Sequence, residues 1–234
     1  MKMDVIKVAC ATCNLREICL PIGLTQPDLE YVGQMVELRR FVERGEALFR
    51  LGDEFKSLFV VWTGFFKTRV LTEGGHDQVT GFQMSGELLG LDGISSDRHT
   101  CDAVALEDSQ ACQIPYERLE GIAREVPGLQ RQLHRLMSRE IVRDHGAMLS
   151  LGSLLAEARL AAFLLDLAHR LQARGFSSSS LHLRMSREEI GSYLGITVET
   201  VSRTFTHFQQ AGLLEVRQRN IHILDEPGLH RLLE

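Results

Sequence analysis

The chain has 234 residues, 44% of them hydrophobic, and carries a formal net charge of −5 at pH 7. This composition allows one large or two smaller domains with buried cores, and the acidic balance argues against a wholly basic nucleic-acid coat protein. Five cysteines, no apolar signal-peptide core and no uncharged apolar stretch of membrane-spanning length predict a protein of the reducing cytoplasm, neither secreted nor membrane-bound.

Three of the five cysteines lie close to the N-terminus, where Cys10, Cys13 and Cys19 have the spacing C-x2-C-x5-C. Together with one distant cysteine they offer four thiolates, which suit a [4Fe–4S] cluster or tetrahedral zinc. A single C-x2-C pair favours iron–sulfur, because zinc sites usually combine two such pairs. The candidates for the fourth ligand are Cys101 and Cys112, both in predicted strands.

Short β-favouring runs follow one another between about residues 35 and 116 and predict a small barrel or roll. The runs are SLFVVW, FFKTRV, DQVTGF, CDAVAL and ACQIPY. Glycine-centred turns separate them, at Gly45, Gly52, Gly64, Gly74-Gly75 and Gly86.

A long helix is predicted over residues 127–156, where the hydrophobic period changes from two to between three and four. Its apolar seam comprises Leu133, Met137, Ile141, Met148, Leu151 and Leu155. Such a seam could pair with its own copy in a homodimer, with Met137, Ile141, Asp144 and Met148 along the contact. Asp144 is either a solvated residue or a charge that opposes its twin and keeps the dimer weak.

The segment MSREEIGSYLGITVETVSRTFTHFQQAGLL has the spacing of a helix-turn-helix. Ser186 and Glu189 form a capping box for the first helix, and Gly195 makes the turn. Thr197 caps a second helix, which ends at Gly212. The segment therefore predicts a DNA-binding unit whose partner is double-stranded DNA.

The second of these helices has an apolar and a polar face. The predicted buried face comprises Val198, Val201, Phe205 and Phe208. The predicted base-reading face comprises Glu199, Ser202, Arg203 and Thr206, with Thr197 at its start. Arg203 suits guanine best, since a guanidinium can bridge O6 and N7. In the wing that follows, Arg217 and Arg219 are expected to contact phosphates.

These motifs together resemble the fumarate and nitrate reduction regulators, the oxygen-sensing branch of the cyclic-AMP receptor superfamily. The resemblance rests on the N-terminal cysteines and on RGEALFRLGDEFKSLF, QVTGFQMSGELLG, RLMSREI and YLGITVETVSR, which occur in the family's order. It implies an α+β protein with four parts. These are a cysteine-rich segment over 1–28, a cyclic-nucleotide-binding-like β-roll over 29–126, a dimerisation helix over 127–156 and a winged helix-turn-helix over 157–234.

The resemblance also implies the site residues. The cluster ligands fall on Cys10, Cys13, Cys19 and Cys112, so that a [4Fe–4S] cluster would promote dimerisation and DNA binding without oxygen. The family's E-x-x-S-R motif falls on Glu199, Ser202 and Arg203 and implies inverted repeats of TTGAT-type half-sites. RNA polymerase is expected as a further partner. In the family's polymerase-contacting surface an acidic residue more often follows a glycine where this chain has the turn Gly75-His76-Asp77.

One departure from the superfamily bears on ligands. Members that bind cyclic nucleotides hold the phosphate with an Arg-Ser pair about ten residues after a Gly-Glu. Here Gly86-Glu87 is followed by His99-Thr100, with Arg98 one place early, which argues against cyclic-nucleotide binding. The chain shows no enzyme signature. The alternative prediction is a regulator of the same fold that responds to another ligand or holds structural zinc.

Overall fold

A computed structural model of the chain describes residues 38–71 and 77–233, together with Cys13, Glu30, Gly33 and Val36. The predictions for Cys10, Cys19, Gly75 and His76 lie outside the described residues. Within the described part, no helix has the length and apolar character needed to cross a membrane. The chain forms two compact units, and the boundary between them lies between Ile141 and Val142.

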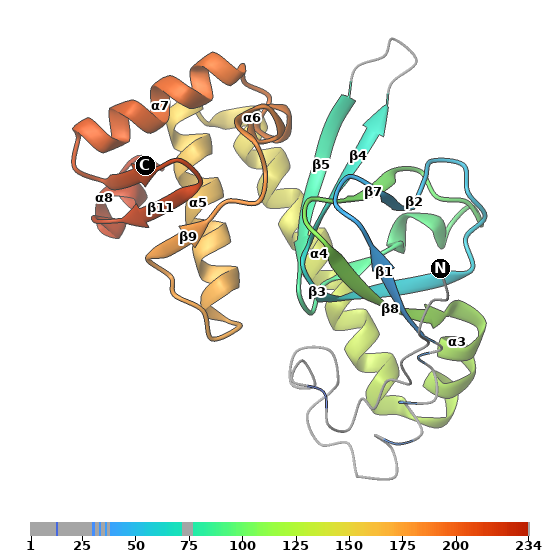
Figure 1. Cartoon of the computed structure of the whole chain (residues 1–234). Coiled ribbons are helices and arrows are strands. Elements are labelled where there is room, and N and C mark those ends of the chain that lie inside the picture. The colour runs from blue at the N-terminus through green and yellow to red at the C-terminus, as the bar shows by residue number, and fades with distance from the viewer. Residues whose placement is uncertain are drawn as a thin grey trace. The chain divides into compact units, whose positions relative to one another are not determined.

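The first unit contains the predicted roll, built from two four-stranded antiparallel sheets (Figure 1). One sheet has the order β1-β8-β3-β6, with β1 Leu38–Val42, β8 Ser109–Pro115, β3 Ser57–Thr63 and β6 Leu88–Leu89. The other has the order β2-β7-β4-β5, with β2 Ala47–Phe49, β7 Asp102–Ala105, β4 Phe65–Leu71 and β5 Asp77–Met84. All the predicted β runs lie in or beside these strands.

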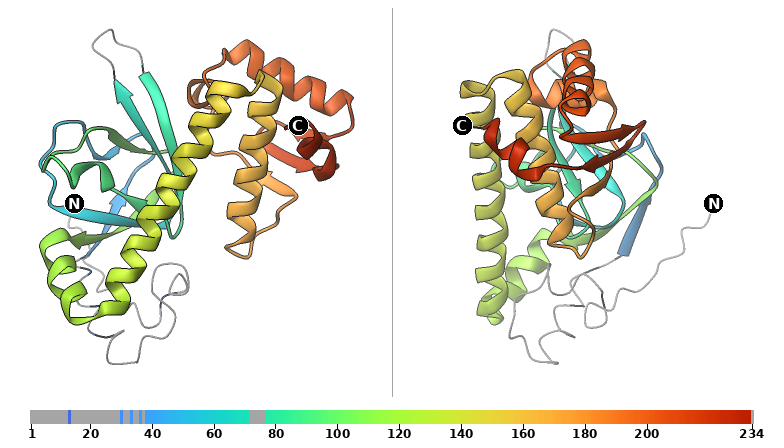
Figure 2. Two further views of the ribbon diagram at one scale, coloured as in Figure 1. Left: turned by 180° about the vertical axis from the view of Figure 1, so that it is seen from behind. Right: turned by 90° about the vertical axis from the view of Figure 1, so that its left-hand side faces the viewer.

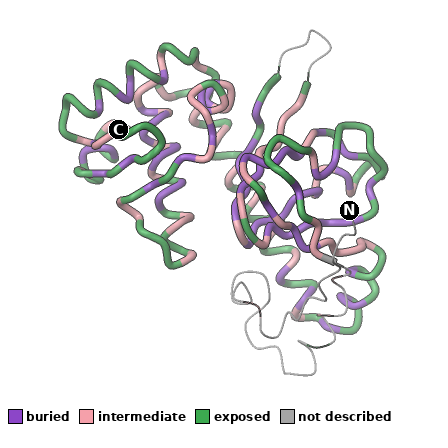
Figure 3. The backbone as a smooth tube through the Cα atoms, viewed as in Figure 1, coloured by how far each residue is buried: buried purple, intermediate pink, exposed green. Residues whose placement is uncertain are grey.

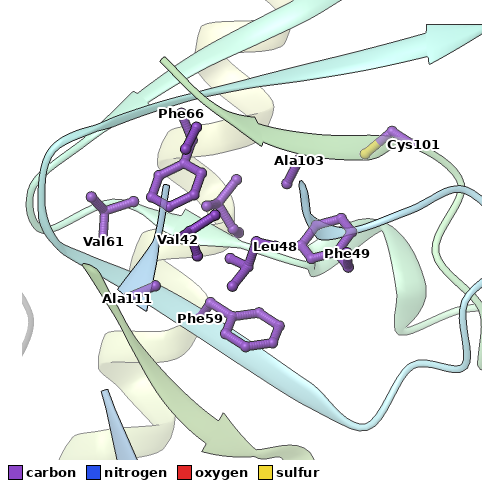
Figure 4. Close-up of a cluster of buried hydrophobic side chains, with 11 residues drawn as sticks. Val42, Leu48, Phe49, Phe59, Val61, Phe66, Cys101, Ala103 and Ala111 are labelled. Carbon is purple, nitrogen blue, oxygen red and sulfur yellow. The ribbon is translucent and has the colours of Figure 1, made fainter. Parts of the chain in front are cut away.

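An apolar core fills the space between the two sheets (Figure 4). It comprises Val42, Leu48, Phe49, Phe59, Val61, Phe66, Leu89, Cys101, Ala103, Ala105 and Ala111. The turn from β3 to β4 requires glycine, because Gly64 has φ +91° and a Cβ there would collide with the Ser109 side chain. The short strands can therefore reverse tightly over a closed core.

Two helices follow the roll, α3 over Tyr116–Glu125 and α4 over Pro127–Ser153. The start of α4 packs on the outer face of the β1-β8-β3-β6 sheet (Figure 1), where Leu133 and Leu136 contact a cluster of Val60, Leu88 and Cys112. A long helix is present where the sequence predicts one. Its first turns share side-chain contacts with the sheet that carries Cys112.

The stretch LSLGSLLAEARLAAFLLDLA is divided between two helices. The first, α4, ends at Ser153, and α5 runs over Ala156–Gln172. The chain turns sharply between them (Figure 2), with Leu155 extended at φ −72° and ψ 163°. Arg159 stabilises the break by donating to the carbonyl oxygens of Leu154 at 2.9 Å and Leu151 at 2.8 Å. Leu155, 84% exposed, is therefore not part of the α4 seam.

The rest of the second unit is a helix-turn-helix with a small sheet. Its elements are β9 Ser180–His182, α6 Arg187–Leu194, α7 Val198–Gln210, β10 Leu214–Arg217, β11 Asn220–Ile223 and α8 Glu226–Arg231. The small sheet has the order β10-β11-β9, and β9 begins at the last residue of the serine stretch 177–180. That strand forms because Leu181 pairs with Ile221 and is buried.

Candidate functional site

Cys112 lies on β8 and faces outward from the roll, toward α4. Its cross-strand partners are Arg39 on β1 and Val60 on β3. The side chain is buried in the cluster that α4 covers. Burial raises the pKa of the Cys112 thiol, and the nearby Arg39 guanidinium acts in the opposite direction. The two cysteines of the roll thus differ in the charge beside them, a cation at Cys112 and the Asp92 carboxylate at Cys101.

Cys13 lies near Cys112, close enough for its charge to raise the pKa of the Cys112 thiol. Of the four predicted ligands, the structure thus brings together one from the N-terminal segment and one from β8. No set of three or more His, Cys, Asp or Glu side chains suited to a metal ion occurs within the described residues, which omit Cys10 and Cys19.

Cys101 occupies a different place, in the core between the sheets (Figure 4). It lies one residue before β7, so its predicted position inside a strand is wrong by one residue. Its Sγ donates to Asp92 Oδ2 at 3.5 Å. Burial, together with the Asp92 carboxylate, raises the pKa of the Cys101 thiol far above its usual value. A thiol held protonated in this way is a poor metal ligand.

His99 fills the position where a phosphate-binding arginine would be expected. The imidazole is buried, stacks on Phe49 with ring centroids 3.7 Å apart, and has Nδ1 3.4 Å from Asp92 Oδ1. Arg98 donates instead to the Gly52 carbonyl oxygen at 2.8 Å. Asp92 Oδ2 accepts from the Thr100 amide at 2.6 Å, and neither His99 nor Thr100 belongs to a strand.

The helix-turn-helix has the capping that the sequence predicts. Ser186 Oγ accepts from the Glu189 amide at 3.1 Å, and Glu189 Oε2 accepts from the Ser186 amide at 2.6 Å. Gly195 ends α6 with φ 62°. Thr197 Oγ1 accepts from the Thr200 amide at 3.2 Å and begins α7. These four positions set the angle at which α7 leaves the turn.

The buried face of α7 differs from its prediction at one position. Val201, Phe205 and Phe208 are buried as expected, but Val198 is 40% exposed. Val198 is the first residue of α7, and helical side chains lean toward the N-terminus, so this one projects beyond the packed turns. Thr204 takes a buried place instead.

Most of α7 is exposed, interrupted by buried positions (Figure 3), and the predicted base-reading residues are all exposed. They are Thr197, Glu199, Ser202, Arg203 and Thr206. Thr206 Oγ1 donates to the Ser202 carbonyl oxygen at 3.1 Å, so its lone pairs rather than its proton face outward. The carboxylate of Glu199 and the guanidinium of Arg203 present one acceptor and one bidentate donor to a groove.

Arg187, at the start of α6, is a residue that the sequence did not single out. Its guanidinium lies 3.4 Å from the centroid of the Phe205 ring, and Nη2 donates to the Gln218 carbonyl oxygen at 3.5 Å. Burial lowers the pKa of Arg187 to about 10. It therefore joins α6, α7 and the wing, a contact that no local sequence signal announces.

The two arginines of the wing have partners inside the protein. Arg217 Nε donates to Glu215 Oε1 at 2.8 Å, and Arg219 Nη1 donates to the Arg184 carbonyl oxygen at 2.9 Å. Both residues are exposed; Arg217 is the last residue of β10, and Arg219 lies in the turn before β11. Because both arginine side chains are exposed to solvent, they are accessible to a phosphate group.

The predicted dimer seam lies along α4. Met137 is half-buried, whereas Ile141 and Met148 are 52% and 69% exposed. Asp144 is exposed between them. Spacings of four, three and four residues place all four side chains on one stripe of the helix, the arrangement of a coiled-coil seam. Large apolar side chains at this exposure mark a surface suited to association.

Two domain descriptions match the chain. Residues 39–125 match the cyclic nucleotide-binding domain, and residues 158–232 match the Crp-like helix-turn-helix domain. Among solved structures, FixK2 from Bradyrhizobium japonicum superposes with a TM-score of 0.76 at 29% identity, covering 83% of this chain and 96% of that one. The predicted order of β-roll, long helix and winged helix-turn-helix is confirmed.

Relatives of similar length are regulators of transcription. The chain is 47% identical over 216 residues to the transcriptional activator protein Anr of Pseudomonas aeruginosa, covering 92% of this chain and 88% of that protein. It is 40% identical over 225 residues to the fumarate and nitrate reduction regulatory protein of Escherichia coli, covering 96% and 90%. These relatives also confirm that the chain is a DNA-binding regulator and not an enzyme. The chain therefore belongs to the family of the fumarate and nitrate reduction regulators, within the Crp-like transcription regulators.

Proposed function

We propose that this protein is an oxygen-responsive transcription regulator of the cytoplasm. Cys10, Cys13, Cys19 and Cys112 would hold a [4Fe–4S] cluster. The cluster-bound protein would dimerise along α4 and bind inverted repeats of TTGAT-type half-sites when oxygen is absent, with RNA polymerase as a further partner. When bound, the cluster supplies a redox centre that oxygen can attack.

The position of Cys112 carries this proposal, because its side chain faces outward from the roll, beside Arg39 and under α4. Cys13, of the C-x2-C-x5-C segment, is close enough for its charge to raise the pKa of the Cys112 thiol. Four thiolates are the usual donor set of a [4Fe–4S] cluster, so the residue types fit. Cys101 does not compete, because it lies in the closed core between the sheets, against Asp92, and not on the face that Cys112 shares with α4.

The packing of Cys112 supports a coupling between ligation and dimerisation. Cys112 shares one apolar cluster with Leu133 and Leu136 of α4. A shift of the Cys112 side chain on ligation would alter how these first turns of α4 pack. Ligation can favour one arrangement of a helix only through such a difference in contacts between two states.

DNA recognition in the proposal depends on α7. In a dimer, two copies of α7 would enter successive major grooves one helical turn apart, which requires an inverted repeat. Arg203 would read guanine, Glu199 would accept from a cytosine amino group, and Ser202 would adapt to either. Arg217 and Arg219 would contact the sugar–phosphate backbone.

The test is to purify the protein without oxygen and to measure iron, acid-labile sulfide and zinc per chain. We expect about four irons and four sulfides, as for four cysteine ligands, and bleaching of the visible spectrum in air. Cys112→Ala should lose both the iron and anaerobic binding to a TTGAT inverted repeat. Cys101→Ala is the matched control and should keep both.

Two results would contradict the proposal. Zinc without sulfide in the wild-type protein would leave a DNA-binding regulator but remove the oxygen switch. Equal iron loss in Cys101→Ala and Cys112→Ala would show that the two thiols are not distinguished by their positions.

A further inference from the structure

A cation lies beside the thiol of Cys112 and is held there by an aromatic ring. Arg39 is the direct cross-strand partner of Cys112 in the β1–β8 pair. The Arg39 Cζ lies 3.5 Å from the centroid of the Trp62 ring. Trp62, on β3, packs against the same cluster as Cys112. Neighbouring side chains on three adjacent strands thus place a guanidinium at the candidate ligand.

The Arg39 guanidinium has a buried hydrogen-bond donor that meets no acceptor within the described part of the protein. Arg39 Nε is buried and has no hydrogen-bond partner there. Leaving a buried donor unpaired costs free energy, so such a group usually marks a missing partner. An arginine side chain is always charged in proteins and can only donate. The missing partner must therefore accept hydrogen bonds and tolerate a positive charge.

We propose that Arg39, held over Trp62, is a positioning residue that stabilises cluster ligation at Cys112 by setting a fixed positive charge and a hydrogen-bond donor beside the ligand sulfur. This inference rests on the proposed function. A cluster with four thiolate ligands carries net negative charge, and the charges and hydrogen bonds around its sulfurs set its potential and its stability. Trp62 matters because the cation–π contact restricts where the long arginine side chain lies.

The sign of the effect follows from electrostatics. A nearby positive charge favours the more negative, reduced cluster, so it raises the reduction potential. It also offsets the net negative charge of a cluster bound by four thiolates, and therefore favours retention of iron. Removing the charge should lower the potential and speed the loss of iron.

The experiment compares the anaerobically purified wild-type protein with Arg39→Gln, Arg39→Lys and Arg40→Gln. Arg40→Gln is the matched control, because it removes the same charge from the next residue of β1, on the opposite face of the strand. The measurements are the anaerobic rate of iron loss to a chelator and the cluster potential from a spectroscopic redox titration. We expect about 10–100-fold faster iron loss and a lower potential in Arg39→Gln. Arg39→Lys, which keeps the charge, should lie between Arg39→Gln and wild type, and Arg40→Gln should match wild type.

Wild-type rates and potential in Arg39→Gln would overturn the inference, as would an equal change in Arg40→Gln. Circular dichroism of the iron-free proteins separates a folding defect from a ligation defect. If Arg39→Gln does not fold, Trp62→Leu replaces it and should speed iron loss by a smaller factor; no change would again overturn the inference. A wild-type protein that takes up no iron would contradict the proposed function itself, whereas a loaded wild type with an unaffected Arg39→Gln would contradict only this inference.

Discussion

Asp92 organises the part of the roll that in cyclic-nucleotide-binding proteins would hold a phosphate. It accepts hydrogen bonds from the Thr100 amide at 2.6 Å and from the Cys101 thiol at 3.5 Å, and lies 3.4 Å from His99 Nδ1. Burial alone would raise the pKa of Asp92, but these partners outweigh it and hold the pKa below its usual value. The Asp92 carboxylate therefore stabilises the loop by hydrogen bonding to residues of the protein itself.

Asp92→Asn should destabilise the protein at neutral pH by about 1–3 kcal/mol, because the charge-assisted hydrogen bonds are lost. The pKa of Asp92 is lower in the folded than in the unfolded chain. Its contribution is thus fully present above the unfolded value of about 4 and is lost as pH falls through the folded value. Urea unfolding at pH 7 and at about pH 3 measures this. The gap between wild type and variant should narrow at the lower pH; a constant gap would contradict the argument. Asp97→Asn, in the same loop, serves as the control.

The two cysteines of the roll show what residue-level prediction can and cannot do. The spacing of the N-terminal cysteines was enough to predict a soft-ligand site, but from the residues alone Cys101 and Cys112 remained equal candidates. Burial does not separate them either, since both are buried. Cys101 lies in the core between the sheets beside the Asp92 carboxylate, whereas Cys112 lies on the outer face beside the Arg39 guanidinium. Both environments depend on the pairing of strands that are far apart in the sequence.

At the scale of elements, α7 and the wing should contribute differently to DNA binding. Arg203→Gln is expected to weaken binding to a TTGAT site by about 1–3 kcal/mol and to abolish discrimination at the guanine position. Arg217→Gln is the comparison. This substitution should weaken binding to all DNA sequences about equally. It should also reduce the slope of the logarithm of the binding constant against the logarithm of the salt concentration by about one, as for the loss of one phosphate contact. Titrations on matched and guanine-substituted duplexes at several salt concentrations measure both. Undiminished discrimination in Arg203→Gln would be against the assignment.

The elements themselves were predictable where local chemistry decides them. Capping boxes, turn glycines and alternating strands are local signals, and the helix-turn-helix and the roll follow from them. The sequence predicts the end of the long helix at residue 156, whereas α4 ends at Ser153, and it does not predict strand β9; both details depend on distant partners. The Arg159 side chain donates hydrogen bonds to the carbonyl oxygens of Leu151 and Leu154 at the end of α4. Pairing with β11 makes a strand of Ser180–His182.

At the scale of the whole molecule, Asp144 should set the balance between monomer and dimer. Two copies of α4 would bring two Asp144 carboxylates together, and like charges in a seam oppose association. Asp144→Ala should therefore be a dimer in air, with a dissociation constant at least about tenfold lower, equivalent to ~1.4 kcal/mol. Analytical ultracentrifugation in air and without oxygen tests this. His145→Ala, off the seam on the same helix, is the control and should behave as wild type. An Asp144→Ala protein that stays monomeric in air would contradict the role given to this charge.

Strand β8 has Ala111 in the core between the sheets and Cys112, the next residue, on the face toward α4. Since successive side chains of a strand point to opposite faces, inserting or deleting one residue between the last turn and Cys112 would exchange these two environments. After a one-residue insertion the Cys112 thiol would enter the closed core and the Ala111 methyl group would face α4. After a one-residue deletion Gln113 would take the place of Cys112. Two-residue insertions would keep the alternation. Insertions or deletions of an even number of residues in this hairpin should therefore preserve iron uptake. Changes of an odd number of residues should remove iron uptake while the roll still folds.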